Sequence, residues 1–170
     1  SGAAEGLRLT LAWRRIFGRW NGFSWDPDIL ERRVFNLACG AKAICARASD
    51  AEEALIALDL ARQARHLLSA IDSPARAAER SASAALAGAV LAGEAGEKLA
   101  EKALERLARA LPATVLPDGG HASRSPQAAL SLLLDLQTLD AALVQRGMSA
   151  PEEMMRAIDR LTGAVRFFTL

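Results

Sequence analysis

Helix start and stop signals recur along this chain, and they constrain its fold more than any other feature. Asp26-Pro27 and Ser125-Pro126 each place a capping residue before a first-turn proline. Ser49-Asp50-Ala51-Glu52 and Ser149-Ala150-Pro151-Glu152 match the capping box, in which two side chains satisfy free helix amides reciprocally. Gly147 follows a leucine-rich stretch as a helix stop. The chain is therefore predicted to be all-α.

The signals divide the chain into about seven helices. The helices are expected to begin near residues 5, 26, 49, 72, 96, 125 and 149, and the last one to end near residue 167. No segment alternates with period two convincingly enough to predict a strand. Short turns make neighbouring helices antiparallel, so we expect antiparallel helical hairpins. A length of 170 residues fits a single domain, residues 1–170, with its own core.

Two of the expected helices differ in where their apolar residues lie. Residues 75–92 carry small side chains on nearly every face, so this helix is predicted to be inside the fold. The helix over 96–111 has one apolar stripe and an opposite charged face, which predicts an outer position. Alternating inner and outer helices indicate a curved layer or toroid rather than a four-helix bundle.

Composition limits the function classes. The net charge of +1 excludes a strongly basic nucleic-acid binder, so no nucleic-acid partner is expected. No stretch approaches the ~20 apolar residues of a membrane span, and arginines break the opening segment where a signal peptide needs an apolar run. We expect a soluble chain without a membrane span or signal peptide, in either the cytoplasm or the periplasm.

Cysteine and histidine usage argues against metal chemistry. Cys39 and Cys45 lie six residues apart in one expected helix, which points them to different faces and disfavours a mutual disulfide. Both are predicted to be small core residues. His66 is expected to pack locally on its helix. Because no ligand set has metal-binding spacing, no metal and no cofactor are expected.

The loop over residues 115–126 is the main candidate site. Its proline, aspartate and glycines are a turn sequence, but twelve residues exceed the roughly 2 to 8 that a helix connection needs. A loop backbone can aim His121 into a cleft. Free amides at Ser125, with the guanidinium of Arg124, would suit an anion. The alternative is that Arg124 is solvated or paired with a neighbouring helix.

An aromatic and basic cluster near the start of the chain has two interpretations. Trp13, Trp20 and Trp25 fall within thirteen residues, with phenylalanines and arginines between them. They could form a surface that stacks on a glycan or a single-stranded nucleic acid. Alternatively, Trp20, Phe23 and Trp25 anchor the corner between the first two helices while the arginines stay solvated.

The loop also carries a family resemblance. Residues 117–126, PDGGHASRSP, resemble the "PDG…(E/R)SP" segment of heparinase II/III-like proteins, and Trp25-Asp26-Pro27, residues 33–37 and residues 166–168 resemble its flanking parts. The resemblance implies an incomplete α/α-toroid from a polysaccharide lyase, a fragment without the large β-sandwich domain that normally follows. Such lyases cleave uronate-containing glycans by β-elimination.

The chain departs from that family where the chemistry is done. Ala128 and Ala129 stand in the places of the usual Tyr-His pair, so the standard tyrosine-based mechanism is excluded and the chain is expected to be non-catalytic alone. His121 is a weak candidate for a catalytic base. The first hypothesis is a domain that binds an acidic polysaccharide through His121, Arg124, Ser125, Trp20 and Trp25.

A second hypothesis is a helical protein-interaction or scaffold module with a concave binding face. It predicts a contiguous exposed apolar groove and indifference to Arg124→Ala. Apolar surface at the open end of an incomplete toroid is expected to be covered by a second copy in a homo-oligomer.

Overall fold

The protein is all-helical, as predicted. The computed structural model describes residues 2–70 and 76–169, with side chains up to residue 167. The described residues form α1 (Gly2–Phe17), α2 (Pro27–Cys45), α3 (Asp50–Ser69), α4 (Ala77–Val90), α5 (Gly93–Thr114), α6 (Pro126–Arg146) and α7 (Glu152–Thr169). Within the same residues the only β feature is an isolated bridge between Val115 and His121.

The caps that the sequence predicts at three of the helices form in the structure. An Asp26 side-chain oxygen accepts from the amide of Asp28 at 2.9 Å, and both halves of the Ser49 capping box are present. Ser125 Oγ accepts from the amide of Ala128 at 3.2 Å, so the side chain of Ser125 caps α6. Gly147 ends α6 with a φ of 71°, the left-handed conformation that glycine adopts at little cost.

Helix boundaries in the middle of the chain follow the sequence less closely. The start signal Asp72-Ser73-Pro74 lies outside the described residues. The fifth helix begins at Gly93 rather than near Gly96 and continues through Pro112 to Thr114, beyond the predicted end near Leu111. Its amphipathic pattern made the interior of this helix predictable but not its ends, which depend on local turns.

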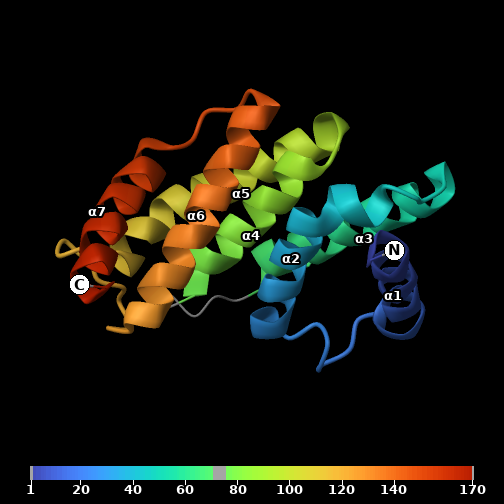
Figure 1. Ribbon diagram of the computed structural model, residues 1–170, viewed down its shortest axis with the longest axis horizontal. Coiled ribbons are helices and arrows are strands. Elements are labelled where there is room, and N and C mark those ends of the chain that lie inside the picture. Colours follow the sequence, from blue (N-terminus) through green and yellow to red (C-terminus); the bar gives the residue numbers. More distant parts are fainter. Residues whose placement is uncertain (1, 71–75, 170) are drawn as a thin grey trace.

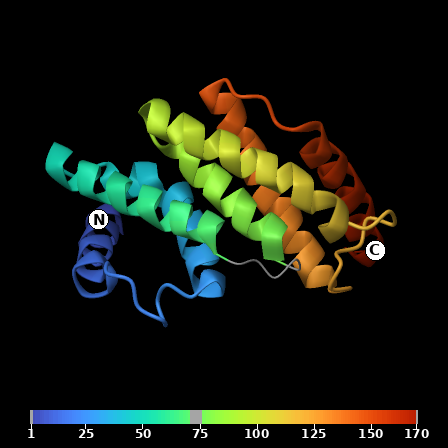
Figure 2. The same ribbon diagram turned by 180° about the vertical axis from the view of Figure 1, so that it is seen from behind.

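The helices are arranged around α4 in an elongated molecule (Figures 1 and 2). α1 lies at one end beside α2 and α3, and α7 lies at the other end. Between them, α4 contacts α2, α3, α5 and α6. Every residue of α4 from Ala78 to Ala89 is buried, which confirms that this helix is inside the fold.

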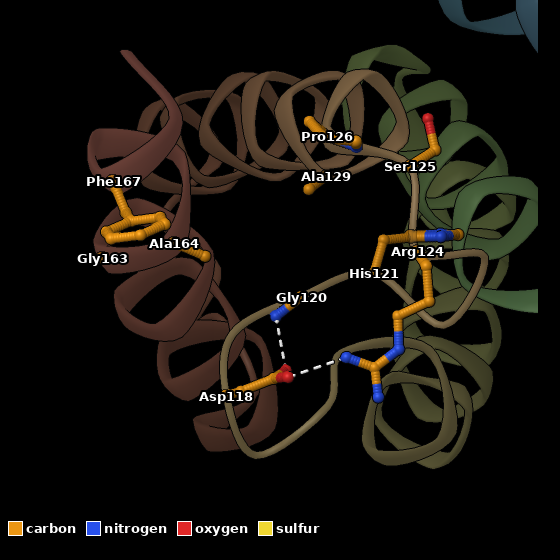
Figure 3. Close-up of a pocket in the computed structure, with 10 residues that line it drawn as sticks. All are labelled: Asp118, Gly120, His121, Arg124, Ser125, Pro126, Ala129, Gly163, Ala164 and Phe167. Atoms are coloured by element: carbon orange, nitrogen blue, oxygen red, sulfur yellow. Dashed lines mark hydrogen bonds and ion pairs between the residues drawn. The ribbon is translucent and has the colours of Figure 1, made fainter. Parts of the chain in front are cut away.

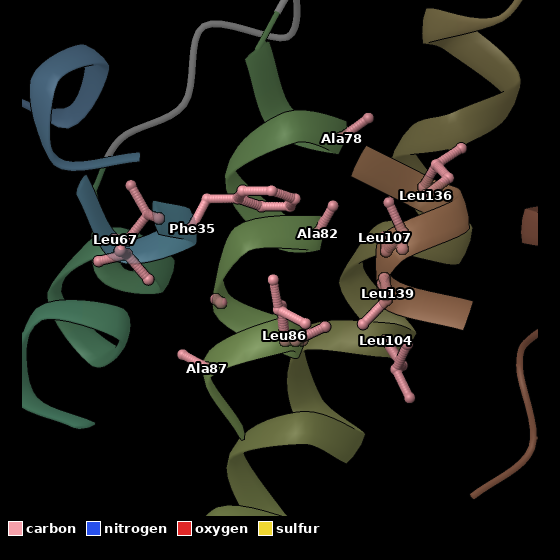
Figure 4. Packing of buried hydrophobic residues seen from close by; sticks show 14 of the residues in the cluster. Phe35, Leu67, Ala78, Ala82, Leu86, Ala87, Leu104, Leu107, Leu136 and Leu139 are labelled. Atoms are coloured by element: carbon pink, nitrogen blue, oxygen red, sulfur yellow. The ribbon is translucent and has the colours of Figure 1, made fainter. Parts of the chain in front are cut away.

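Side chains from the neighbouring helices meet on α4 (Figure 4). Phe35 and Leu67 lie on one side of it, and Leu107, Leu136 and Leu139 lie on the other. Each fully buried leucine contributes roughly 1.5–3 kcal/mol through removal of apolar surface from water. The small residues of α4 let its neighbours approach closely, so a single thin helix forms the centre of the core.

Candidate functional site

The loop between α5 and α6 folds into a closed turn beside a pocket. The amide of Leu116 donates to Gly120 O and that of Gly119 donates to Leu116 O, both at 2.9 Å. Gly119 has a φ of 80°, and a Cβ there would lie 2.3 Å from Arg160 O on α7, so both conformation and space require glycine. The loop, the start of α6 and the end of α7 enclose a pocket of about 360 Å³ (Figure 3).

His121 holds the loop against α4. Its side chain is buried, with Nε2 3.3 Å from Glu79 Oε1, while Nδ1 accepts the backbone amide of Ser123 at 3.1 Å. An accepting Nδ1 places the ring proton on Nε2, where it can be donated to Glu79. Ser123 Oγ also lies 2.7 Å from Nδ1. Glu79 faces Nε2 and Ser123 faces Nδ1, the reverse of a serine-hydrolase triad, so these contacts of His121 tie the loop to α4.

The protein fills its own anion-binding corner. Arg124 Nη1 lies 2.8 Å from Asp118 Oδ2, and Asp118 Oδ1 accepts the amide of Gly120 at 2.9 Å (Figure 3). The pKa of Asp118 is lowered by the Gly120 amide and then by Arg124. Since Ser125 also caps α6, the guanidinium and the helix start both have protein partners. The pair stays largely solvated, since the side chains of Arg124 and Asp118 are 69% and 59% exposed, and the partner of Arg124 lies on the loop and not on a neighbouring helix.

The sequence-based candidates are only partly brought together. His121, Arg124 and Ser125 line the same pocket, whereas neither Trp20 nor Trp25 does. Trp25 is buried at the corner after α1: its Nε1 donates to Phe17 O at 3.0 Å, and its ring meets His66 edge-on at 5.3 Å between centroids. His66 on α3 therefore packs against a residue from outside its own helix, which differs from the expected local packing.

The corner interpretation therefore holds for one tryptophan and fails for two other aromatics. Trp25 anchors the corner, but the side chains of Trp20 and Phe23 are 69% and 76% exposed. Because all three are large aromatic residues close together in the chain, sequence alone could not decide which of them would be covered. That choice depends on where α3 packs.

Two buried carboxylates and two partly exposed arginines connect α2 with the start of α4 and with α6. Glu31 is fully buried and accepts from Arg76 Nη2 at 2.6 Å. Arg32 lies 3.3 Å from the same carboxylate and binds both oxygens of Asp135 on α6, at 2.6 and 3.0 Å. The hydrogen bond to Asp135 raises the pKa of Arg32. Of these two ion pairs, one runs from α2 toward the start of α4 and the other runs from α2 to α6.

The burial of charged residues was not predicted from the sequence. Residues 75–92 were predicted to lie inside the fold, yet the same segment carries Glu79 and Arg80, and both are buried. An inside helix must bury its own charges, so partners on neighbouring helices were implied. Arg80 Nη2 finds one in Asp28 on α2, at 2.9 Å.

A second concavity is a groove between α2 and α6, which we call the α4 groove. Its volume is about 850 Å³. α2 and α6 both pack against α4, yet among the described helices they do not approach each other closely along their backbones. The floor is the end of α4, and α3 closes one side. Its lining comprises residues 38, 39, 41, 42 and 45 on α2, 53, 56, 57 and 60 on α3, 86 and 90–92 at the end of α4, and 134, 137, 138, 141, 142 and 145 on α6.

The α4 groove is apolar and open to solvent. Leu134 projects from α6 with 53% of its side chain exposed, and Val90 at the end of α4 is 39% exposed. Lys42 and Glu53 are the charged residues of the lining. The Arg32–Asp135 ion pair spans from α2 to α6 next to Leu134, at one end of the groove. A concave apolar face is what the interaction-module hypothesis predicted.

Both cysteines line the α4 groove, which corrects the prediction that they are core residues. Cys39 is exposed and Cys45 is half-buried, and both are free thiols. Partial burial raises the pKa of each thiol, and Asp135 raises that of Cys39 further. Free cysteines are often buried, which is why burial was expected. The face of α2 that carries Cys39 and Cys45, however, has no described helix packed over it.

Metal-ligating clusters and membrane-spanning helices were both predicted to be absent. Within residues 2–70 and 76–169 no group of three or more metal-ligating side chains is present. α6 is long and apolar enough to cross a membrane by length and composition, and it is the one such helix in the described part of the chain. Its buried leucines pack on the core, and a core helix passes the same test.

Comparisons with known proteins correct the family resemblance. The chain is 58% identical over 169 residues to the FtsZ-localized protein C of Caulobacter vibrioides, an alignment that covers 99% of the chain and 29% of that protein. No family model matches the chain, and no solved structure matches it. The chain thus spans less than a third of the length of the curated relative.

The lyase interpretation does not survive these findings. Neither heparinase nor polysaccharide lyase appears among the comparisons, and the named relative is described by its localization with FtsZ. The resemblance rested on short loop motifs, and the structure explains those residues as a turn: Gly119 for backbone space, Asp118 to hold Gly120 and Arg124, and Ser125 as a cap. Turn and cap residues recur in unrelated proteins because the same backbone geometry needs them.

Proposed function

We propose that this chain is a helical protein-interaction module that acts where FtsZ is located, and that its binding site is the α4 groove. The observation that carries the proposal is an open apolar groove of about 850 Å³ between two helices whose backbones stay apart. The relative's name supplies the location: a protein with 58% identity to this chain is FtsZ-localized. The proposed role is binding, with no enzymatic step.

Two features favour binding over catalysis. The groove offers apolar surface with few charges, which is the composition of a recognition surface. His121, the weak candidate for a catalytic base, is buried, and its ring nitrogens have partners in Ser123 and Glu79. These contacts tie the loop to α4, and His121 is not among the residues that line the α4 groove.

The proposal is tested with purified FtsZ of Caulobacter vibrioides and a matched pair of variants. Leu134→Glu places a charge inside the groove, whereas Val144→Glu places one on α6 at a position that is 70% exposed and outside the groove lining. We expect the chain to co-sediment with FtsZ filaments. Leu134→Glu should weaken that binding about tenfold or more, because a buried unpaired charge costs more than about 1 kcal/mol. Val144→Glu should stay within about twofold of the parent.

A third variant separates the groove from the loop pocket. Arg124→Ala removes the Asp118 partner at the pocket and should leave FtsZ binding unchanged. The native thiols give an independent readout, because bound FtsZ should slow alkylation of Cys39 and Cys45. Absence of co-sedimentation, or equal losses in the two glutamate variants, would refute the proposal.

A further inference from the structure

We propose that α1 is a releasable cover: it swings about its C-terminal end, hides a face of α2 and α3 while it is closed, and is held less tightly because Arg33 lies beneath it. This movement does not depend on what the α4 groove binds. It gives α1 a regulatory role, because the face beneath can be reached only when α1 is open.

α1 is fixed at one end and lightly held at the other. At its C-terminal end, Trp25 Nε1 donates to Phe17 O at 3.0 Å, and the guanidinium of Arg62 on α3 donates to Gly18 O. Among the described residues of α1, Leu7 alone is buried. A rotation about the fixed end would therefore lift the N-terminal half of the helix while breaking few apolar contacts.

The face beneath α1 contains a cation without an acidic partner. Trp13 of α1 covers Arg33 of α2, with 4.2 Å from the guanidinium carbon to the ring centroid, and Arg33 Nε donates to the buried Gln63 at 2.7 Å. Arg33 Nη2 is buried and finds no hydrogen-bond partner among the described residues. Burial lowers the pKa of Arg33 to about 10. Closure of α1 therefore withholds water from a charge that the described residues do not neutralise.

A second arginine at the same interface has the opposite effect. Arg14 on α1 reaches Asp59 on α3, with Nε 2.5 Å from Oδ2. Because this ion pair joins α1 to α3, it favours the closed position. The desolvation of Arg33 opposes closure, so the closed and open positions are closer in free energy than the contacts of α1 alone would make them.

The hidden face is apolar around these charges. A small cavity of about 10 Å³ lies between α1 and the helices beneath it, and its walls include Leu37 on α2 and Ile56 and Leu60 on α3. Ile56 and Leu60 also line the α4 groove, so α1 covers residues that belong to a wall of that groove. Opening would add this face, with Arg33 and Asp59, to the surface that a partner can reach.

Opening is measured with a thiol placed under α1. Leu37→Cys, combined with Cys39→Ser and Cys45→Ser, leaves one thiol, at a position that lines the covered cavity and is outside the α4 groove lining. Its alkylation by a small maleimide follows the open fraction when closing is faster than the reaction. We expect Arg33→Met to slow alkylation about threefold or more, because the unpaired charge is removed at similar helix propensity. If Arg33 instead anchored α1 through Trp13, the same substitution would speed alkylation.

Two further substitutions in the probe variant serve as controls. Arg14→Ala removes the ion pair with Asp59 and should speed alkylation about threefold or more. Arg15→Met removes a charge from an exposed residue of α1 and should stay within about twofold of the probe variant. Hydrogen exchange of α4 amides shows whether each variant keeps its core.

A disulfide far from the fixed end gives an independent test. A Cβ on Gly6 would lie 3.7 Å from Cγ1 of Ile44 on α2, a spacing that suits a bond between thiols introduced by Gly6→Cys and Ile44→Cys. Once oxidised, this pair should slow alkylation at position 37 about tenfold or more, because α1 can no longer lift. Reduction should restore the rate, with the products assigned by peptide mass.

Each outcome decides the inference. It is overturned if Arg33→Met leaves alkylation unchanged or speeds it, if Arg15→Met slows it as much, or if the probe reacts only as fast as α4 amides exchange. It is also overturned if oxidation of the introduced pair leaves the probe as reactive as before. FtsZ enters none of these measurements, so the proposed function can fail separately.

Discussion

Glu31 illustrates how single residues balance burial against pairing in this fold. The carboxylate is fully buried on α2 and accepts from Arg76 at 2.6 Å. Burial raises its pKa above the ordinary 4.5, and the hydrogen bond from Arg76 opposes that rise without cancelling it. The ion pair therefore only partly compensates for the desolvation of the carboxylate, as is common for buried ion pairs.

A pH dependence follows from that balance. Because the pKa of Glu31 is higher in the folded state than in the unfolded state, the folded protein binds more protons above pH 4.5, and this residue's contribution to stability falls as the pH rises through its folded pKa. In urea titrations at several pH values from about 4 to about 7, the free energy of unfolding of the parent minus that of Glu31→Gln should decrease with pH. A difference that is flat or increases with pH would contradict a raised pKa for Glu31.

At the scale of the helices, α4 and α5 approach each other closely at Gly88, and the absence of a side chain there makes the approach possible. A Cβ on Gly88 would lie 2.4 Å from the backbone nitrogen of Ala100 on α5. A backbone atom cannot move aside by a rotamer change, as a side chain could. By contrast, a Cβ on Gly163 in α7 would meet no atom within 4 Å. Both glycines lie inside helices, so the main difference between them is how close the neighbouring atoms are.

Alanine substitution at these two sites should change stability in opposite directions. Gly88→Ala should lower the free energy of unfolding by about 1–3 kcal/mol, because α4 and α5 must move apart. Gly163→Ala should raise it by up to about 1 kcal/mol, because alanine has the higher helix propensity. Chemical denaturation followed by circular dichroism measures both. Equal effects would show that the close approach is not limiting.

At the scale of the whole molecule, the helices differ in how many neighbours cover them. α4 lies between α2, α3, α5 and α6, whereas α1 contacts α2, α3 and, through Phe17 O, Trp25, and has one buried residue, Leu7 (Figure 1). Local opening costs least where few apolar contacts must be broken. α1 is held by its contacts with two helices and by the Arg14–Asp59 ion pair at 2.5 Å.

Hydrogen exchange should therefore follow the position of each helix. Measured by mass spectrometry on the intact chain, amides in α4 should exchange slowest, through global unfolding, and those in α1 should exchange at least about tenfold faster. Arg14→Ala should speed exchange in α1 and leave α4 unchanged, since that ion pair joins α1 only to α3. Comparable protection in α1 and α4 would mean that the molecule opens as one unit.

Much of the fold could be predicted from the sequence, whereas the α4 groove could not. Local signals such as Asp26-Pro27 and the Ser49 capping box located helix starts, since a cap involves only neighbouring residues. The α4 groove left no comparable signal, because its walls lie far apart in the chain and Cys39 was expected to be a core residue. The PDGGHASRSP motif suggested an anion site because the sequence does not show that Asp118 reaches Arg124.

By itself the sequence determined the helical class, the number of helices and the position of α4 inside the fold, because caps and side-chain size act over one or two turns. Only the tertiary structure decided which apolar faces stay open, which charges pair and which aromatics are covered. Those outcomes depend on the distances between helices. α2 and α6 are held by α4 and tied by Arg32 and Asp135, and the space they leave is set by packing that no single segment encodes.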